Sequence, residues 1–166
     1  MTIDEWIASL PAEIKGDTLW KMEAYRLSLF SAEIGWHDVT ELMKDRRTIG
    51  LADQLYRSLG SVSANLAEGY SHHTGKSCAQ FYQYSLGSAR ESRDWYYKSH
   101  HILKEEVVRH RISLLTQIIK LLLTMIPQQR GKTLTLREQP AAYLVNATSL
   151  ELQISLTSLL EQIPLP

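Results

Sequence analysis

Polar side chains that could do chemistry recur at helical spacing in two neighbouring stretches of the 166-residue chain. The first stretch carries Gln54, Ser58, Ser61, Asn65 and Glu68, and the second carries Ser85, Ser88 and Glu91. Two carboxylates on facing helices can transfer protons or hold a metal ion. Metal sites in helical bundles usually need a Glu-x-x-His pair, however, and no histidine stands three residues after Glu68 or Glu91. The pattern therefore favours a structural polar seam, with no metal ion and no cofactor.

Arg93, Asp94 and His100 form an enzyme-like pattern, which is similar to a short motif of helical nucleotide-binding ribonucleases. Arg93 and His100 are seven residues apart, so both lie on one face of a helix. The histidine could act as general acid or base while the arginine holds the scissile phosphate. Because so short a pattern often arises by chance, we expect that the chain is not an enzyme. A helical-bundle ribonuclease is the alternative function.

The other metal-binding and nucleophilic residue types give weaker signals. His72 and His73 are adjacent, as are His100 and His101, and adjacent helical residues point about 100° apart, so neither pair chelates easily. Cys78 is the only cysteine, which excludes an internal disulfide framework and a cysteine zinc cluster. The sequence thus predicts no metal site, and the low cysteine content favours a cytoplasmic protein.

Four long helices are expected to position these residues. Apolar residues at steps of three and four predict helices over residues 17–43, 51–70, 76–101 and 105–128. Gly35 predicts a kink or break in the first of them. Gly69 is the expected end of the second, Thr74 the expected N-cap of the third and Pro127 the expected end of the fourth. The short link between the second and third helices makes them antiparallel neighbours.

Shorter elements are expected on both sides of these helices. A helix over residues 3–9 should precede Pro11, and Asp17 or Thr18 is the expected N-cap of the first long helix. Apolar residues at helical spacing predict a short amphipathic helix in the tail; these are Leu152, Leu156, Leu159, Leu160 and Ile163. Alternate residues from Leu150 to Leu156 are also apolar, which leaves a strand open as the other interpretation.

The expected fold is therefore all-α, an antiparallel up-down four-helix bundle with a short extra N-terminal helix and a C-terminal tail. We expect the N-terminal helix and a linker over residues 1–16, the bundle over residues 17–130, and a connector and tail over residues 131–166. The most apolar run, from Leu114 to Ile126, is too short to span a bilayer, so no membrane is expected.

The apolar patterns also predict which helix faces point inward. In the first long helix the predicted inward residues are Met22, Tyr25, Leu29, Ala32, Trp36, Val39 and Met43. In the third they are Phe81, Tyr84, Ser85, Ser88, Glu91, Ser92, Trp95, Ser99 and Ile102. The fourth carries two overlapping apolar series, a width that favours either deep burial or an oligomer contact.

Charge is unevenly distributed although the formal net charge is zero. Residues 46–137 carry 14 basic and 6 acidic side chains, whereas residues 1–45 carry 4 basic and 9 acidic ones. A basic middle can attract nucleic acid, or the acidic ends can fold back over it. The candidate nucleic-acid contacts are Arg46, Arg47, Arg57, Lys76, Arg90, Arg93, Lys98 and Lys104, together with Arg109 and Arg111.

Three motifs resemble a known protein family. They are Gln54-Leu-x-Arg57, Ser61-Val62-x-x-Asn65-Leu-Ala-Glu68-Gly69, and Leu86-Gly87-Ser88-Ala89-x-Glu91. Over roughly residues 20–125 the chain is similar to the four-helix-bundle proteins encoded in ribosomal-RNA intervening sequences. The resemblance implies an up-down four-helix bundle that assembles as a ring-shaped homopentamer, with no enzymatic activity.

The resemblance also implies partners. Copies of the same chain are the first, and related bundles are accessory proteins that bind reverse transcriptase and nucleic acid. RNA, DNA or a nucleic-acid enzyme is therefore an open alternative partner. The chain departs from the family pattern in its neutral charge, in its extra N-terminal helix and tail, and in the missing Phe-Pro break between the first two helices.

Overall fold

The computed structural model describes residues 2–131, 156–161 and 163–166; most of them lie in helices and none in a strand. The elements in chain order are α1 (Ile3–Ser9), α2 (Ala12–Gly16), the 3-10 helix η1 (Thr18–Lys21), α3 (Glu23–Leu42), α4 (Ile49–Tyr70), α5 (Gly75–Lys98), the 3-10 helix η2 (Ser99–His101) and α6 (Glu105–Arg130). Residues 156–161 form a further short helix. The four long predicted helices and the predicted helix over residues 3–9 are thus confirmed.

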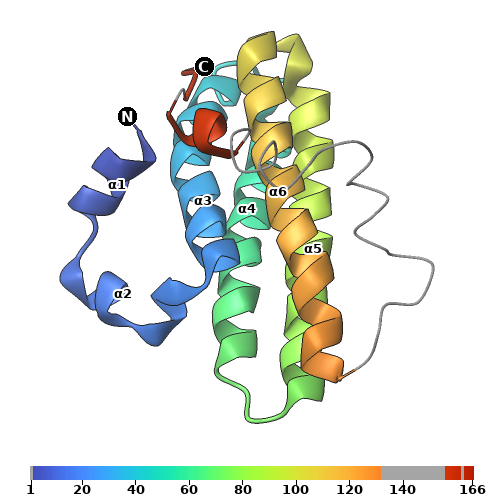
Figure 1. Ribbon diagram of the computed structural model, residues 1–166. Coiled ribbons are helices and arrows are strands. Elements are labelled where there is room, and N and C mark those ends of the chain that lie inside the picture. The colour runs from blue at the N-terminus through green and yellow to red at the C-terminus, as the bar shows by residue number, and fades with distance from the viewer. Residues whose placement is uncertain (1, 132–155, 162) are drawn as a thin grey trace.

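The four long helices pack side by side around one apolar core (Figure 1). Helix α4 packs against α3 and α5, while α6 packs against α5 and α3. Short connections link α4 to α5 and α5 to α6, which keeps consecutive helices next to each other. None of the described helices combines the length and the apolar character that crossing a membrane requires.

Helix α3 is continuous through Gly35, so it has no break there. A Cβ atom on Gly35 would lie 2.5 Å from Leu59 Cδ1 and 3.4 Å from the Tyr96 hydroxyl oxygen. The glycine therefore leaves room for the Leu59 side chain of α4 and the Tyr96 hydroxyl of α5. Asp17 caps η1 instead of the long helix, because its side chain accepts a hydrogen bond from the Leu19 amide.

Helix ends follow the sequence signals only in part. Thr74 is confirmed as the N-cap of α5, where its hydroxyl accepts the Ser77 amide at 3.2 Å. Gly69 lies within α4, which ends at Tyr70. A Cβ at Gly69 would lie 2.9 Å from the Tyr82 ring, so the glycine makes room for α5. Pro127 lies inside α6, which continues to Arg130 and is capped by Gly131 in the left-handed conformation with φ 62°.

Two of the predicted inward faces are rotated relative to the structure. Trp36 and Met43 of α3 are 56% and 52% exposed, because this helix instead buries Leu27, Phe30 and Ile34. In α5, two residues that were predicted to face inward, Tyr84 and Glu91, are likewise exposed. The residues that α5 buries are Cys78, Ala79, Tyr82, Ser85, Leu86, Ala89, Ser92 and Tyr96. A helix that packs against two neighbours buries a wide sector of its surface, so a single apolar series does not show where the centre of that sector lies.

Both apolar series of α6 face the interior of the chain. Its buried apolar residues are Val107, Val108, Leu114, Leu115, Ile118, Ile119, Leu122, Leu123 and Ile126. Residues of the C-terminal segment, defined here as residues 156–161 and 163–166, pack against the same core; they are Leu156, Leu160 and Ile163. Deep burial, the first of the two alternatives for this helix, therefore accounts for its apolar width.

The chain ends contact the same group of helices. Trp6 of α1 is buried, with its ring centroid 5.0 Å from that of Phe30 in α3. The C-terminal helical turn contacts α6 (Figure 1). The predicted tail helix is confirmed over residues 156–161, whereas Leu150, Leu152 and Ile154, on which the strand interpretation rests, lie outside the described residues.

Candidate functional site

Serine hydroxyls bridge α4 and α5 at two points of the predicted polar seam. Ser92 Oγ donates to Ser58 Oγ over 2.8 Å, and Ser85 Oγ donates to the Val62 carbonyl over 2.8 Å. Ser58, Ser85 and Ser92 are all buried. Each hydroxyl that is satisfied in this way avoids a desolvation penalty of about 1–3 kcal/mol. These contacts hold the helices together and offer no open site.

The remaining residues of the predicted seam lie beside this contact or outside it. Ser61 Oγ, Asn65 Nδ2 and Ser88 Oγ donate to backbone carbonyls of their own helices. The other three residues are exposed, namely Gln54, Glu68 and Glu91. Glu91 accepts a hydrogen bond from Trp95 Nε1 on the same helix. The two carboxylates therefore do not meet in a shared buried site.

A buried charged network joins α3, α5 and α6. Arg111 of α6 donates to Asp38 of α3 through two bonds, Nε to Oδ2 at 2.7 Å and Nη2 to Oδ1 at 3.1 Å. The Tyr96 hydroxyl of α5 donates to Asp38 Oδ2 at 2.7 Å. Asp38 and Tyr96 are 0% exposed and Arg111 is 2% exposed. Three of the four long helices thus meet at one buried ion pair.

The network continues through His110 to the C-terminal segment. Arg111 Nη1 lies 2.9 Å from His110 Nδ1, and His110 Nε2 lies 2.6 Å from the Leu159 carbonyl oxygen. Arg111 Nη2 also donates to the Pro164 carbonyl at 3.0 Å. Two adjacent residues of α6 therefore bind two backbone carbonyls of the chain end.

Burial shifts the pKa values of two members of the network. The pKa of Tyr96 is raised well above its ordinary value, first by desolvation and then by the nearby negative charge of Asp38. Tyr96 therefore stays protonated and donates. Desolvation also lowers the pKa of His110, and the positive charge of Arg111 adds to this effect. His110 is accordingly neutral at pH 7.

Sequence reasoning missed this network, although a signal was present. Arg111 stands between Val107 and Leu114 at the spacing of an apolar series in α6. Asp38 stands in the same way between Ile34 and Leu42 of α3. A charge that fills a position of an apolar series is unusual on a solvated face, and two such charges of opposite sign on different helices indicate a buried pair.

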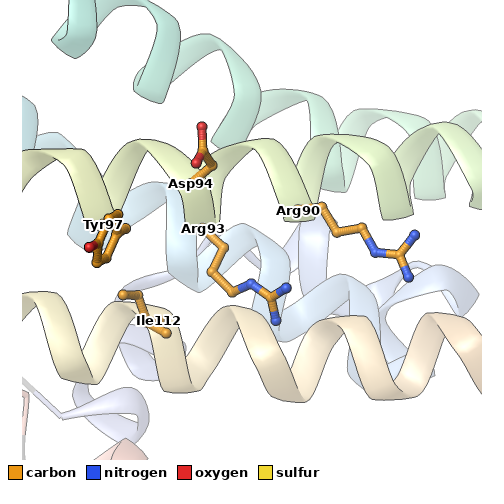
Figure 2. Close-up of a pocket in the computed structure, with 5 residues that line it drawn as sticks. All are labelled: Arg90, Arg93, Asp94, Tyr97 and Ile112. Carbon is orange, nitrogen blue, oxygen red and sulfur yellow. The ribbon is translucent and has the colours of Figure 1, made fainter. Parts of the chain in front are cut away.

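A cationic groove opens between α5 and α6. It encloses about 370 Å³ and is lined by Arg90, Arg93, Asp94, Tyr97 and Ile112. Figure 2 shows both guanidinium groups extending between the two helices, while Asp94 points away from them. Arg93 Nη1 lies 3.4 Å from the Thr116 hydroxyl of α6, and the Tyr97 side chain is 65% exposed. The groove therefore joins two positive charges to an accessible aromatic ring.

The other predicted nucleic-acid contacts do not share this groove. Arg57 and Lys98 form ion pairs with Asp53 and Asp94 on their own helices. Arg47 pairs with Asp45 and lowers the pKa of that carboxyl to about 2.

The remaining candidates belong to other parts of the chain. Arg46 lies in the α3–α4 connection and Lys76 in the first turn of α5. Lys104 and Arg109 line a hollow of about 480 Å³ with Glu105 and Glu106, so its charges are balanced. Arg111 is buried, so it cannot contact nucleic acid as the sequence suggested.

The predicted ribonuclease pair is not brought together in the groove. His100 lies in η2, beyond the end of α5, and its Nδ1 contacts the Tyr97 carbonyl. His100 is not among the residues that line the groove with Arg93. His72 stacks on Phe81 with ring centroids 4.7 Å apart. Among the described residues, no cluster of three His, Cys, Asp or Glu side chains could hold a metal ion.

These features define an all-helical protein of packed long helices joined by a buried ion pair. The chain belongs to the family described as 23S rRNA-intervening sequence protein, whose model matches residues 21–124. The match covers α3, α4, α5 and most of α6, and it leaves out α1, α2 and the C-terminal segment. Comparison with curated proteins and with solved structures gave no match.

Proposed function

We propose that the protein is a non-catalytic homo-oligomer, an up-down four-helix bundle that serves as a cytoplasmic scaffold or accessory protein. The observation that carries the proposal is an exposed aromatic pair on the outer side of α3 and α4. Trp36 and Tyr56 are 56% and 42% exposed, and their ring centroids lie 5.6 Å apart in an edge-to-face arrangement.

Trp36 and Tyr56 have the chemistry of an interface centre. Tryptophan and tyrosine are enriched among the residues that dominate binding energy in protein interfaces. Met43 and Ile49, towards the connection of the same two helices, are 52% and 47% exposed. A second copy of the chain is the favoured occupant, because the resemblance to the intervening-sequence proteins implies a ring of five.

The proposal predicts that replacing both Trp36 and Tyr56 by alanine dissociates the assembly. Both side chains are exposed in the single chain, so their loss should remove interface area and leave the fold intact. The mass measured by light scattering after size-exclusion chromatography should fall to 19.0 kDa, the mass of one chain.

Tyr84→Ala is the matched control, since Tyr84 is 50% exposed but lies on α5. It should leave the mass of the assembly unchanged. An unchanged assembly mass in the Trp36→Ala/Tyr56→Ala variant would place the interface elsewhere. Circular dichroism of each variant establishes that the helices are retained.

The α5–α6 groove supports a second candidate function, the binding of single-stranded nucleic acid. Arginine side chains bind phosphate, and exposed aromatic rings stack on unpaired bases. Arg90, Arg93 and Tyr97 supply both kinds of group within one groove. This candidate is compatible with the oligomer, because the groove and the Trp36–Tyr56 pair lie on different helices.

Arg93→Gln is expected to weaken binding of a single-stranded RNA and to flatten its salt dependence. Each phosphate contact contributes about one unit to the slope of log affinity against log salt, so the slope should change by about 1. Arg57→Gln on α4 is the control and should change neither quantity. Equal effects of the two variants would exclude the groove, and RNA cleavage that is lost in His100→Ala would favour the ribonuclease alternative.

A further inference from the structure

The C-terminal segment is held on α6 by hydrogen bonds to its backbone. His110 Nε2 contacts the Leu159 carbonyl, Arg111 Nη2 contacts the Pro164 carbonyl, and Lys104 Nζ lies 3.4 Å from the Leu165 carbonyl oxygen. We propose that this segment is a releasable strap that docks only while His110 is neutral, so that acidification detaches it from the bundle. The proposal is independent of the oligomer.

The hydrogen-bond partners of His110 assign its protonation state. An arginine side chain carries only donors, so His110 Nδ1, 2.9 Å from Arg111 Nη1, must be the acceptor. The single proton of the neutral ring then lies on Nε2, which donates to the Leu159 carbonyl at 2.6 Å. Both ring nitrogens thus have a hydrogen-bond partner, and only the neutral ring satisfies both contacts.

Protonation of His110 would act directly on this arrangement. A proton on Nδ1 would face the N–H of Arg111, so an acceptor would be replaced by a second donor. It would also add a positive charge beside a guanidinium group. The protonated ring keeps its Nε2 donor for the Leu159 carbonyl, so the cost of protonation arises at Arg111, whose Nη2 holds the Pro164 carbonyl of the segment.

The charged and titratable groups around His110 lie on α3, α5, α6 and the C-terminal segment. Arg111 is its neighbour on α6, and Asp38 of α3 lies beyond Arg111. Tyr96 of α5 faces Asp38 and stays protonated. The C-terminal segment offers the Leu159 carbonyl, and its one described acidic side chain, Glu161, is exposed. Asp38 is therefore the carboxylate that the contacts place near His110, and its charge is already paired with Arg111.

The sign of the pH effect follows from the pKa of His110. Desolvation is the largest cause of the lowered pKa of His110 and Arg111 adds to it, while the bond to the Leu159 carbonyl and the charge of Asp38 raise it. Arg111 and Asp38 stay beside His110 after release, so the pKa returns towards its ordinary value of 6.5 because the ring regains water. A histidine with a lower pKa in the docked state favours docking fully above pH 6.5. This contribution is lost as the pH falls below 6.5, and each unit of pKa difference changes the docking equilibrium about tenfold.

The segment is able to leave without unfolding the rest of the chain. Its helix covers only residues 156–161, and so short a helix is not stable alone in water. Leu156, Leu160 and Ile163 pack against the core but remain partly exposed. The family match covers residues 21–124 and does not include this segment.

Hydrogen–deuterium exchange of the full-length protein tests the strap. Exchange rates of peptides covering residues 156–161, corrected for the intrinsic effect of pH, should rise severalfold between about pH 7.5 and about pH 5.5. Peptides from the centre of α6 should stay protected over the same range. Exchange at the C2 position of each histidine, read by mass spectrometry, gives the pKa of His110 in the same samples.

Two variants separate His110 from other groups. His110→Gln places an amide donor near Nε2 without titrating, and it should abolish the pH dependence. His101→Gln changes an exposed histidine and should leave the dependence intact. The proposal is overturned by pH-independent protection in the wild-type protein or by an unchanged pH dependence in His110→Gln. If the C-terminal segment does not dock in His110→Gln, the wild-type protein alone supplies the test. The proposal is then overturned if the pKa of His110 in the wild-type protein differs from the pH at which half of the segment is released.

Discussion

Replacing Asp38 by asparagine is expected to lower the free energy of unfolding by about 3–5 kcal/mol. The carboxylate accepts three hydrogen bonds, two from Arg111 and one from Tyr96, and its residue is 0% exposed. Asparagine would remove the negative charge and turn one oxygen into an NH2 donor that faces other donors. Arg111 would then carry an unpaired charge in the interior.

Urea denaturation followed by circular dichroism measures this loss. The control is the triple variant Asp38→Leu, Tyr96→Phe and Arg111→Met, which removes both charges and the hydroxyl together. Buried ion pairs that are replaced by apolar residues of similar size usually cost little or nothing in stability. The triple variant should therefore be much more stable than Asp38→Asn. Equal destabilisation of both would show that packing volume, and not an unpaired charge, controls this position.

Gly75→Ala should destabilise the protein by about 1–3 kcal/mol through overpacking. A Cβ atom at this position would lie 2.1 Å from the backbone oxygen of Gln129. Gly75 begins α5 and Gln129 lies in the last turn of α6, so the clash is between two backbones and no side chain can move aside. One helix end must shift to admit the methyl group.

Gly87→Ala is the matched control within the same helix. Nothing lies within 4 Å of a Cβ at Gly87, and this residue is exposed. Alanine is favoured over glycine in a helix interior by about 0.5–1 kcal/mol, so this variant should be slightly more stable than the wild type. Thermal unfolding of both variants gives the comparison, and a Gly75→Ala midpoint at or above that of Gly87→Ala would contradict the close approach of α5 to α6.

Local signals predicted the helices well. Thr74 caps α5 through its own side chain, and the helix over residues 3–9 begins with a capping box between Thr2 and Glu5. Such features depend on residues three or four positions apart, which a sequence displays directly. Gly35 and Gly69 were misinterpreted because their role is to admit another helix, and the neighbour that each one admits is distant in the sequence.

The candidate sites were harder to predict because they depend on how each helix is rotated. Of the residues predicted for one seam, Ser58 and Ser85 bridge α4 and α5, whereas Glu68 and Glu91 are exposed. The Asp38–Arg111 pair joins residues 73 positions apart on helices that the sequence does not show to be neighbours. Only the packing of α3 against α6 brings the two charges together.

The mass of the wild-type protein in solution tests the central proposal most directly. Light scattering after size-exclusion chromatography, or analytical ultracentrifugation at micromolar concentration, supplies it without any variant. We expect a multiple of the 19.0 kDa of one chain, which for five copies is about 95 kDa. A mass of 19.0 kDa under these conditions would contradict the homo-oligomer.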